Sequence, residues 1–217
     1  MLCCDIGIGW SIRPDLRYRY LPIEGGTVPR IVAVVLANDP GAGFAGSKYL
    51  SDVGGITLID RTLADSSVWP VDEVVVVLGP DAEDVAATLE SWDVTVVIDP
   101  EWEEGSAASL RVGLDVVMRG PAADLVVIAL ADQPGVLASD VAALVEAAED
   151  VAAAVPKYRY RRGFPIVLAR DSWEQLLGLE GDVDLLGLLE SHPAGVAEVW
   201  LDHLETPRIH SPEDING

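Results

Sequence analysis

The sequence predicts an α/β protein, a Rossmann-like three-layer α/β/α sandwich with a mostly parallel sheet. Short runs rich in valine, isoleucine and leucine recur along the chain, which is typical of strands buried on both faces. Segments with the apolar spacing of helices separate these runs. Strands that alternate with helices pair in parallel through right-handed crossovers, with helices on both faces of the sheet.

The expected elements follow one another along the chain. Strands are expected over residues 31–36, 74–78, 94–98, 125–130, 152–155, 163–168 and 196–201. Helices are expected over residues 81–90, 106–118, 141–148, 172–179 and 183–190. Acidic residues crowd the first turn of helix 81–90, as the helix dipole favours. In helix 106–118, Leu110, Leu114 and Val117 share one face.

Composition indicates one folded unit. Of the 217 residues, 50% are hydrophobic, so a globular chain is expected. No repeat, low-complexity tract or linker divides it. We therefore expect a single domain over residues 31–217, preceded by an extension of unknown role over residues 1–30.

The charge and the cysteines exclude several classes of function. A formal net charge of −22 at pH 7 repels nucleic acid, and no basic stripe is present to overcome it. It also repels nucleoside triphosphates unless a metal ion or a local cation compensates. No apolar run is long enough to span a membrane, and no secretory signal is apparent at the start. Cys3 and Cys4 are adjacent, which argues against a disulfide framework and structural zinc, so a cytoplasmic protein is expected.

A glycine-rich loop follows the first strand, where open α/β sheets bind nucleotides. It contains Gly41, Gly43 and Gly46, and Lys48 closes it. Backbone N–H groups approach phosphates closely where no Cβ intervenes. The spacing matches neither the P-loop nor the dinucleotide fingerprint, so the loop fits a plain tight turn as well as a phosphate cradle. The position of Lys48 favours a phosphate contact over a solvated surface lysine.

Asp132 follows the apolar strand 125–130 and precedes Gln-Pro. A carboxylate at the carboxyl end of a buried strand is poorly placed to be core, whereas Mg²⁺ is bound by one or two carboxylates together with phosphate oxygens and water. The alternative is a cap of the next helix, but Ser139 lies nearer to the start of that helix. Asp132 is therefore predicted to bind a metal ion or ligand.

The start of helix 106–118 is a further candidate. Gly105, Ser106 and Ser109 place exposed N–H groups and small hydroxyls there, which suit a ribose or a base edge. Simple capping of the helix by Ser106 fits the segment equally well.

An arginine-rich segment precedes Pro165. Arg161 and Arg162, followed by Gly163, form a positive cluster that fits an anionic second substrate. The same residues fit a hairpin whose arginines pair with acidic neighbours.

In combination these segments resemble the MobA/MocA-like nucleotidyltransferases, which attach CMP or GMP to the phosphate of molybdopterin. VVLANDPGAGFAGSK is similar to the family's Leu-Ala-Ala-Gly loop that ends in lysine, and LADQP to its magnesium-binding turn. DPEWEEGSAASLRVGL is similar to its nucleotide-side loop and helix. YRYRRGFPIVL with EGDVDLLGLL is similar to its substrate-side half, and SPED to its terminal Asp-x-Asp-Thr-Pro-Glu-Asp segment. The resemblance covers residues 31–215.

The resemblance implies a fold of the nucleotide-diphospho-sugar-transferase type and a Mg²⁺-dependent reaction. An acceptor phosphate would attack the α-phosphorus of CTP or GTP and release pyrophosphate. Lys48 and Asp132 would be catalytic, and Asp132 and His210 would occupy the metal positions. The implied nucleotide-binding residues are Leu36, Ala37, Asn38, Gly41, Gly43, Lys48, Gly105, Ser106 and Ser109, and the implied acceptor-binding residues are Arg161, Arg162, Gly163 and Pro165. The implied partners are CTP or GTP, a phosphorylated acceptor such as molybdopterin, and a molybdoenzyme or its maturation factor.

The chain departs from the family pattern at two places. The family loop carries glycine where this chain has Asp39 and arginine where it has Gly43, and its second terminal aspartate is His210 here. Arg30, Arg111 or an N-terminal arginine are candidates for the missing positive charge. Two alternatives to the enzyme stay open: a catalytically degenerate relative that acts as a binding or partner protein, and a nucleotidyltransferase for another phosphorylated acceptor.

Overall fold

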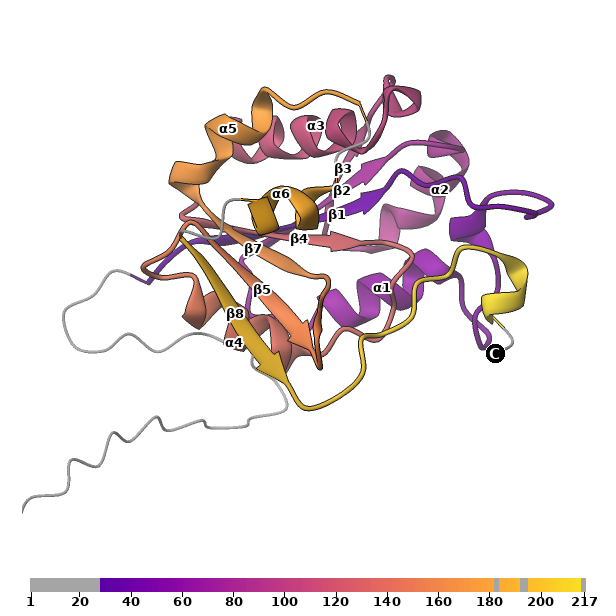
Figure 1. Cartoon of the computed structure of the whole chain (residues 1–217). Helices are drawn as coiled ribbons and strands as arrows, with labels where there is room; N and C mark the ends of the chain where they lie inside the picture. The colour runs from indigo at the N-terminus through magenta and orange to yellow at the C-terminus, as the bar shows by residue number, and fades with distance from the viewer. Residues whose placement is uncertain (1–27, 182–183, 192–194, 216–217) are drawn as a thin grey trace, which may run out of the picture.

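The computed structural model describes residues 28–181, 184–191 and 195–215. These residues form one sheet between two layers of helices (Figure 1), which confirms the predicted three-layer sandwich. Residues 1–27 of the expected N-terminal extension lie outside the described residues, as does Val183, the expected start of the last helix. Among the described residues, no helix has the length and apolar character needed to cross a membrane.

The sheet has the strand order β3-β2-β1-β4-β7-β5, and β6 and β8 also pair with β5. The strands are β1 (Ile31–Ala37), β2 (Glu73–Leu78), β3 (Thr95–Ile98), β4 (Leu125–Leu130), β5 (Ala153–Tyr158), β6 (Arg161–Arg162), β7 (Ile166–Ala169) and β8 (Val196–Leu201). Strands β3, β2, β1 and β4 pair in parallel, and so do β5 and β8. The predicted, mostly parallel character of the sheet is confirmed.

Strand β7 is an exception to the parallel pairing, because it runs antiparallel to both β4 and β5. It follows β5 after a tight β5–β6 hairpin, and a connection this short cannot make the crossover that parallel strands require. The expected sixth strand, 163–168, therefore exists as Ile166–Ala169, and it runs antiparallel to both of its neighbours in an otherwise mostly parallel sheet.

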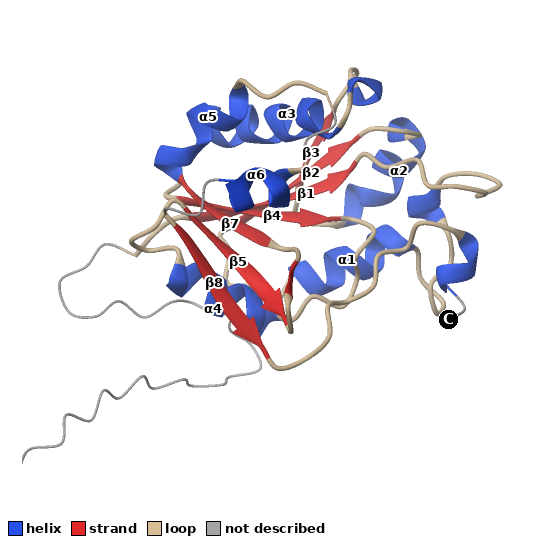
Figure 2. Ribbon diagram, viewed as in Figure 1, coloured by secondary structure: helices blue, strands red, loops and turns tan. Residues whose placement is uncertain are grey.

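Helices cover both faces of the sheet (Figure 2). They are α1 (Leu58–Ser66), α2 (Ala82–Thr88), α3 (Ser106–Arg119), α4 (Ala138–Ala147), α5 (Trp173–Leu177) and α6 (Leu185–Ser191). Alternate residues of β1 enter opposite cores: Ala33 and Val35 pack on the side of α1, α2 and α4, and Val34 and Leu36 on the side of α3, α5 and α6. A strand buried on both faces is expected to be continuously apolar, as β1 is.

Helix α1 was not among the predicted helices. Its N-terminus is capped by Thr57, whose hydroxyl accepts the N–H of Asp60 at 3.2 Å. Leu58, Ile59 and Leu63 then enter the core at helical spacing. The cap and this spacing are visible in the sequence, so the helix could have been predicted.

Helix α3 approaches the sheet closely at Gly113, where a Cβ would lie 2.5 Å from Cγ1 of Val34. The absence of a side chain lets the helix lie directly on β1 and β2. This packing brings the start of α3, with Gly105 and Ser106, to the cavity that the carboxyl ends of β1 and β4 also line.

Candidate active site

Lys48 and Asp132, the two predicted catalytic residues, are in direct contact. Asp132 lies two residues beyond β4, and Lys48 begins a short 3₁₀ turn, Lys48–Leu50, after the glycine loop that follows β1. Because β1 and β4 are adjacent and parallel, both segments leave the same edge of the sheet. Nζ of Lys48 lies 2.8 Å from Oδ2 of Asp132, and the two side chains are 0% and 2% exposed.

Asp39 is the second partner of Lys48, with Oδ2 2.8 Å from Nζ. Burial alone would raise the pKa of Asp39, but the hydrogen bonds from Lys48 and from the N–H of Gly41, with the charges of Lys48 and Arg208, hold the pKa below its usual value. The aspartate that departs from the family loop therefore belongs to the site as an ionised carboxylate.

The glycine loop wraps the lysine. At Gly41, which has a φ of +71°, a Cβ would lie 2.7 Å from Cδ of Lys48, so only glycine leaves room for the lysine stem. The N–H of Gly41 donates to Oδ1 of Asp39 at 2.8 Å, and the N–H of Asp39 donates to the hydroxyl of Tyr49 at 3.0 Å. The N–H of Ala42 donates to the carbonyl of His210 at 2.9 Å. These three N–H groups thus have partners within the protein, as expected for the plain tight turn that the sequence left open beside a phosphate cradle.

The C-terminal segment closes the site. The N–H of Ile209 donates to the carbonyl of Asp132 at 2.8 Å, which ties this segment to the end of β4. Beyond it, one oxygen of Asp214 accepts the N–H groups of His210 and Ser211 and the hydroxyl of Ser211, and these hydrogen bonds lower the pKa of Asp214. Together with the hydrogen bond from Ala42 to His210, these contacts hold residues 208–214 beside the loop that follows β1.

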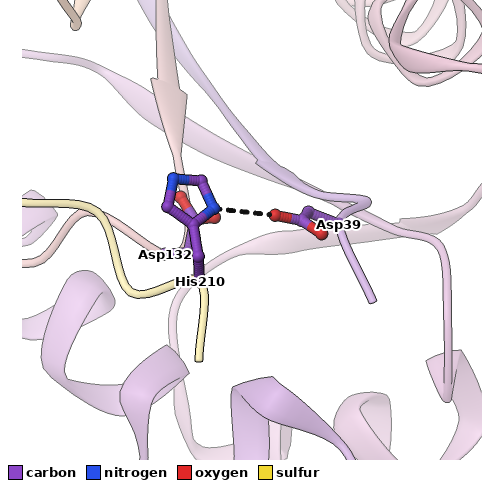
Figure 3. Close-up of side chains that lie close together, drawn as sticks. All are labelled: Asp39, Asp132 and His210. Carbon is purple, nitrogen blue, oxygen red and sulfur yellow. Dashed lines mark ion pairs between the residues drawn. The ribbon is translucent and has the colours of Figure 1, made fainter. Parts of the chain in front are cut away.

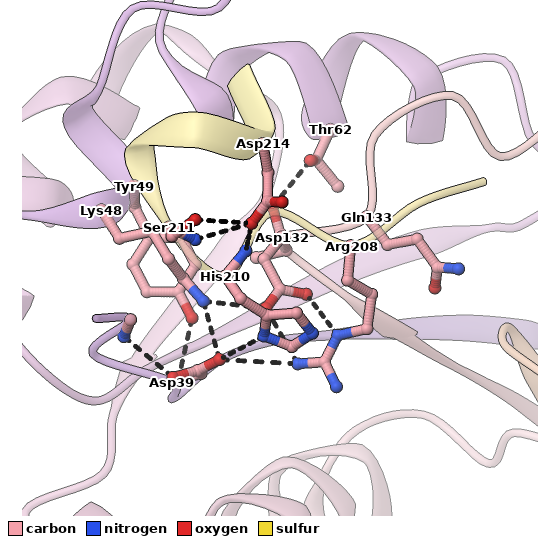
Figure 4. A network of polar contacts seen from close by, with 12 residues as sticks. Asp39, Lys48, Tyr49, Thr62, Asp132, Gln133, Arg208, His210, Ser211 and Asp214 are labelled. Carbon is pink, nitrogen blue, oxygen red and sulfur yellow. Dashed lines mark hydrogen bonds and ion pairs between the residues drawn. The ribbon is translucent and has the colours of Figure 1, made fainter. Parts of the chain in front are cut away.

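Arg208 adds a second positive charge to the site, beside that of Lys48. Its Nε lies 3.0 Å from Oδ1 of Asp132 and its Nη2 lies 2.8 Å from Oδ2, a bidentate pair, and Nη2 is 3.7 Å from Asp39 (Figure 4). Burial lowers the pKa of Arg208, but its hydrogen bonds to Asp132 and the charges of Asp132 and Asp39 together raise that pKa above its ordinary value.

Of the candidates suggested for the charge of the family's loop arginine, Arg30 and Arg111 lie elsewhere, and the arginines before residue 28 fall outside the described residues. Arg30 pairs with Glu73 at the amino end of β1, where Nη2 is 2.7 Å from the carboxylate. Arg111 donates to the carbonyl of Leu179. Sequence reasoning missed Arg208, although it stands two residues before His210, at the first position of the segment aligned with the terminal Asp-x-Asp motif.

A cavity of about 580 Å³ opens beside this cluster. Of the predicted nucleotide-binding residues, Leu36, Asn38, Gly105 and Ser106 line it, whereas Ala37, Gly41, Gly43, Lys48 and Ser109 do not. Asp39, Arg208 and His210 also line the cavity, and Asp132 does not. Asp39 and Arg208 are therefore the carboxylate and the cation of this cluster that face the cavity.

Ser109 is part of the core. Its hydroxyl donates to Oδ2 of Asp99 at 2.7 Å, and both residues are buried. Oδ1 of Asp99 accepts the N–H of Glu101 at 2.9 Å. This arrangement links the end of β3 to helix α3 and supports the loop that carries Gly105.

The predicted acceptor-binding residues lie in and after the β5–β6 hairpin. Nε of Arg162 lies 2.9 Å from the carboxylate of Glu198, which also pairs with Lys157. Arg162 is therefore in a hairpin and pairs with an acidic residue, which is one of the two alternatives that the sequence left open. Arg161 is exposed. Between Gly163 and Pro165, Phe164 lines the cavity, so the segment reaches it through this aromatic side chain.

Asp39, Asp132 and His210 form a group that could hold a divalent cation. Their ligand atoms lie within 4.8 Å of one another (Figure 3). Oδ1 of Asp132 and Oδ1 of Asp39 each accept one hydrogen bond, which leaves one lone pair on each oxygen. Carboxylate oxygens are the donors that Mg²⁺ and Mn²⁺ prefer, so the residues present fit such an ion.

Comparison with known proteins identifies relatives of this chain. A family model described as the MobA-like NTP transferase domain matches residues 33–196. The structure of a homologue of Mycobacterium tuberculosis Rv0371c, from Mycobacterium sp. strain JC1, is 31% identical with a TM-score of 0.77, over 86% of this chain and 93% of that one. Rv0371c from Mycobacterium tuberculosis H37Rv in complex with manganese is 26% identical with a TM-score of 0.74, over 86% and 96%.

A curated relative carries a different activity in its name. Nicotine blue oxidoreductase from Paenarthrobacter nicotinovorans is 29% identical over 119 residues, or 54% of this chain. The match spans 57% of the length of that protein.

Proposed function

This chain belongs to the family of the MobA-like NTP transferase domain, and from that premise we propose that it is a divalent-metal-dependent nucleotidyltransferase. It transfers CMP or GMP from CTP or GTP to a phosphorylated acceptor and releases pyrophosphate. The observation that carries the proposal is that Asp39, Arg208 and His210 line one cavity of about 580 Å³, with Asp132 directly behind them. Cavities of roughly 300–1,000 Å³ are typical of small-molecule sites.

The metal ion belongs at the two aspartates. Asp39 and Asp132 would hold Mg²⁺ through their remaining lone pairs, with His210 as a third ligand. The bound ion would supply charge compensation for the phosphates. The manganese complex of Rv0371c supports a divalent metal in this family. Lys48, buried between the two carboxylates, positions them rather than reaching the cavity itself.

The nucleoside fits the apolar part of the cavity. Leu36 and Leu130 line it at the ends of β1 and β4, and Trp102 adds an aromatic surface. Asn38 and Ser106 contribute polar side chains suited to a ribose or a base edge.

The acceptor phosphate requires no general base, because a phosphate monoester is already an anion at neutral pH. One of its oxygens forms a bond to the α-phosphorus, and the bond from that phosphorus to the bridging oxygen of the β-phosphate breaks. Molybdopterin is the acceptor that the resemblance favours, with the segment around Phe164 as its entry and a molybdoenzyme or its maturation factor as the recipient of the product.

Calorimetry with CTP and GTP, with and without Mg²⁺ or Mn²⁺, tests the first half of this proposal. Metal-dependent binding of one triphosphate is expected, and no binding under any condition would refute the enzyme. Pyrophosphate release with molybdopterin and with sugar phosphates as acceptors then tests the second half. Asp132→Asn serves as the variant without metal, and it should release no pyrophosphate with any acceptor.

One observation favours the degenerate alternative. Both oxygens of Asp132 accept hydrogen bonds from cationic side chains, Lys48 and Arg208, so the carboxylate is neutralised without a metal ion. A chain in which Lys48 and Arg208 always occupy Asp132, so that the cluster is closed to a metal ion, would serve as a binding or partner protein. The same calorimetry separates the two functions, since a permanently closed cluster binds neither Mn²⁺ nor triphosphate.

A further inference from the structure

Arg208 separates Asp132 from the cavity. The side chain of Asp132 is 2% exposed and does not line the cavity, whereas the side chain of Arg208 is 35% exposed and does. The guanidinium covers the carboxylate with Nε and Nη2. Its third nitrogen, Nη1, makes no hydrogen bond to any residue that the structure describes and is directed away from Asp132 in Figure 4.

The charges of the cluster are already balanced. Lys48 and Arg208 carry two positive charges, and Asp39 and Asp132 carry two negative charges within hydrogen-bond or ion-pair distance. A divalent cation that enters alone adds two uncompensated positive charges at a half-buried site, which is unfavourable. A cation that enters with a triphosphate brings its own anion, and the guanidinium is then attracted to the phosphate oxygens, to which Arg binds in the same bidentate manner.

We propose that Arg208 is a triphosphate-binding residue that competes with the divalent cation for Asp132 until a nucleotide arrives. In the absence of nucleotide the guanidinium occupies Asp132. When the triphosphate enters, Nη1 and then Nη2 take phosphate oxygens. Oδ2 of Asp132, which keeps its hydrogen bond from Lys48, then gains a free lone pair for the ion beside that of Oδ1, and the repulsion between guanidinium and ion is relieved. Metal and nucleotide therefore bind cooperatively, and Arg208 is the residue that couples them. This inference rests on the proposed function, since it assigns a role at the same site.

The competition predicts effects of opposite sign from one substitution. In Arg208→Gln, Mn²⁺ alone should bind roughly 10- to 100-fold more tightly, because a charged competitor for Asp132 is gone. The same variant should bind CTP or GTP in the presence of Mn²⁺ roughly 10-fold more weakly, because the phosphates lose a cation. A residue with a purely structural role would weaken both.

Free Mn²⁺ measured by electron paramagnetic resonance gives the first affinity, and calorimetry with the triphosphate gives the second. Arg119→Gln is the matched control: Arg119 also pairs with a carboxylate, that of Asp115 at 2.6 Å, on the exposed side of α3. It should leave both affinities unchanged. If Arg208→Gln does not fold, Arg208→Lys is the second variant, because it keeps the positive charge but cannot form the bidentate pair. It should also bind Mn²⁺ more tightly and the triphosphate more weakly than wild type, with smaller changes than those expected for Arg208→Gln.

Equal Mn²⁺ affinity in wild type and Arg208→Gln, or weaker binding of both ligands in the variant, overturns the inference. The proposed function fails separately, when wild type transfers no nucleotide to any acceptor. If Arg208→Gln shifts the two affinities in opposite directions but the wild type has no transferase activity, the role of Arg208 is upheld and the enzyme is refuted. Transferase activity combined with unchanged affinities in the variant would do the reverse.

Discussion

Lys48 donates a hydrogen bond to Asp132 across 84 residues of sequence, with Nζ 2.8 Å from Oδ2. A buried ammonium is tolerated only with compensating charge, and here two carboxylates, those of Asp132 and Asp39, supply it. Arg208 supplies a second positive charge, with Nη2 2.8 Å from Oδ2 of Asp132. The loop after β1, the turn after β4 and the C-terminal segment are thus joined by one set of ion pairs.

The two lysines of the chain offer a direct test of this burial. Lys48→Met should lower the free energy of unfolding by about 3 kcal/mol, because it leaves two carboxylates near each other with one cation. Lys157→Met should cost less than about 1 kcal/mol, because Lys157 is partly exposed and its partner Glu198 keeps Arg162. Urea denaturation of both variants measures the difference, and equal losses would contradict the assigned role of Lys48.

Two serines of α3 should separate stability from nucleotide binding. Ser109→Ala removes the hydrogen bond to buried Asp99 and should cost about 1–3 kcal/mol of stability without changing triphosphate affinity. Ser106→Ala alters the lining of the cavity and should weaken triphosphate binding roughly 3- to 10-fold. Thermal unfolding and calorimetry on the same preparations give both values. The reverse pattern would restore Ser109 to the nucleotide site.

Asp39 should contribute to the acid stability of the fold. Because its pKa is lower in the folded chain than its ordinary value of 3.8, its ionisation stabilises the fold above that value, and this stabilisation is lost as the pH falls through the folded pKa. Asp39→Asn should therefore lose less stability than wild type between pH 5 and about pH 3. Urea midpoints at these pH values test the prediction, and parallel curves for the two proteins would exclude it.

The close approach of α3 to β1 predicts a steric effect at Gly113. Gly113→Ala should destabilise the fold by about 1–3 kcal/mol, because the added Cβ would lie 2.5 Å from Val34 in a packed core. Gly120→Ala is the control, since its Cβ would meet only backbone oxygens at 3.5 Å or more. Should Gly113→Ala be as stable as Gly120→Ala, the helix must have room to shift away from the sheet.

The elements were predictable where local pattern determines them. The central strands β1, β2 and β4 lie within a residue of the expected ranges, because a strand buried on both faces needs a continuous apolar run. Helix α3 was predicted from its apolar face. Helix α1 was missed although its cap and core positions are present in the sequence. The direction of β7 followed from the length of the hairpin before it, which the alternation of strands and helices did not reveal.

The sequence by itself determined the fold class, and it singled out Lys48 and Asp132, which the structure brings into direct contact. Only the tertiary structure decided that Asp39 and Arg208 complete the cluster, that Lys48 is sealed from the cavity and that Ser109 belongs to the core. The physical reason is the range of the forces involved. Apolar periodicity and capping act between neighbours in the chain, whereas the partner of a buried charge depends on which distant loops meet at the edge of the sheet.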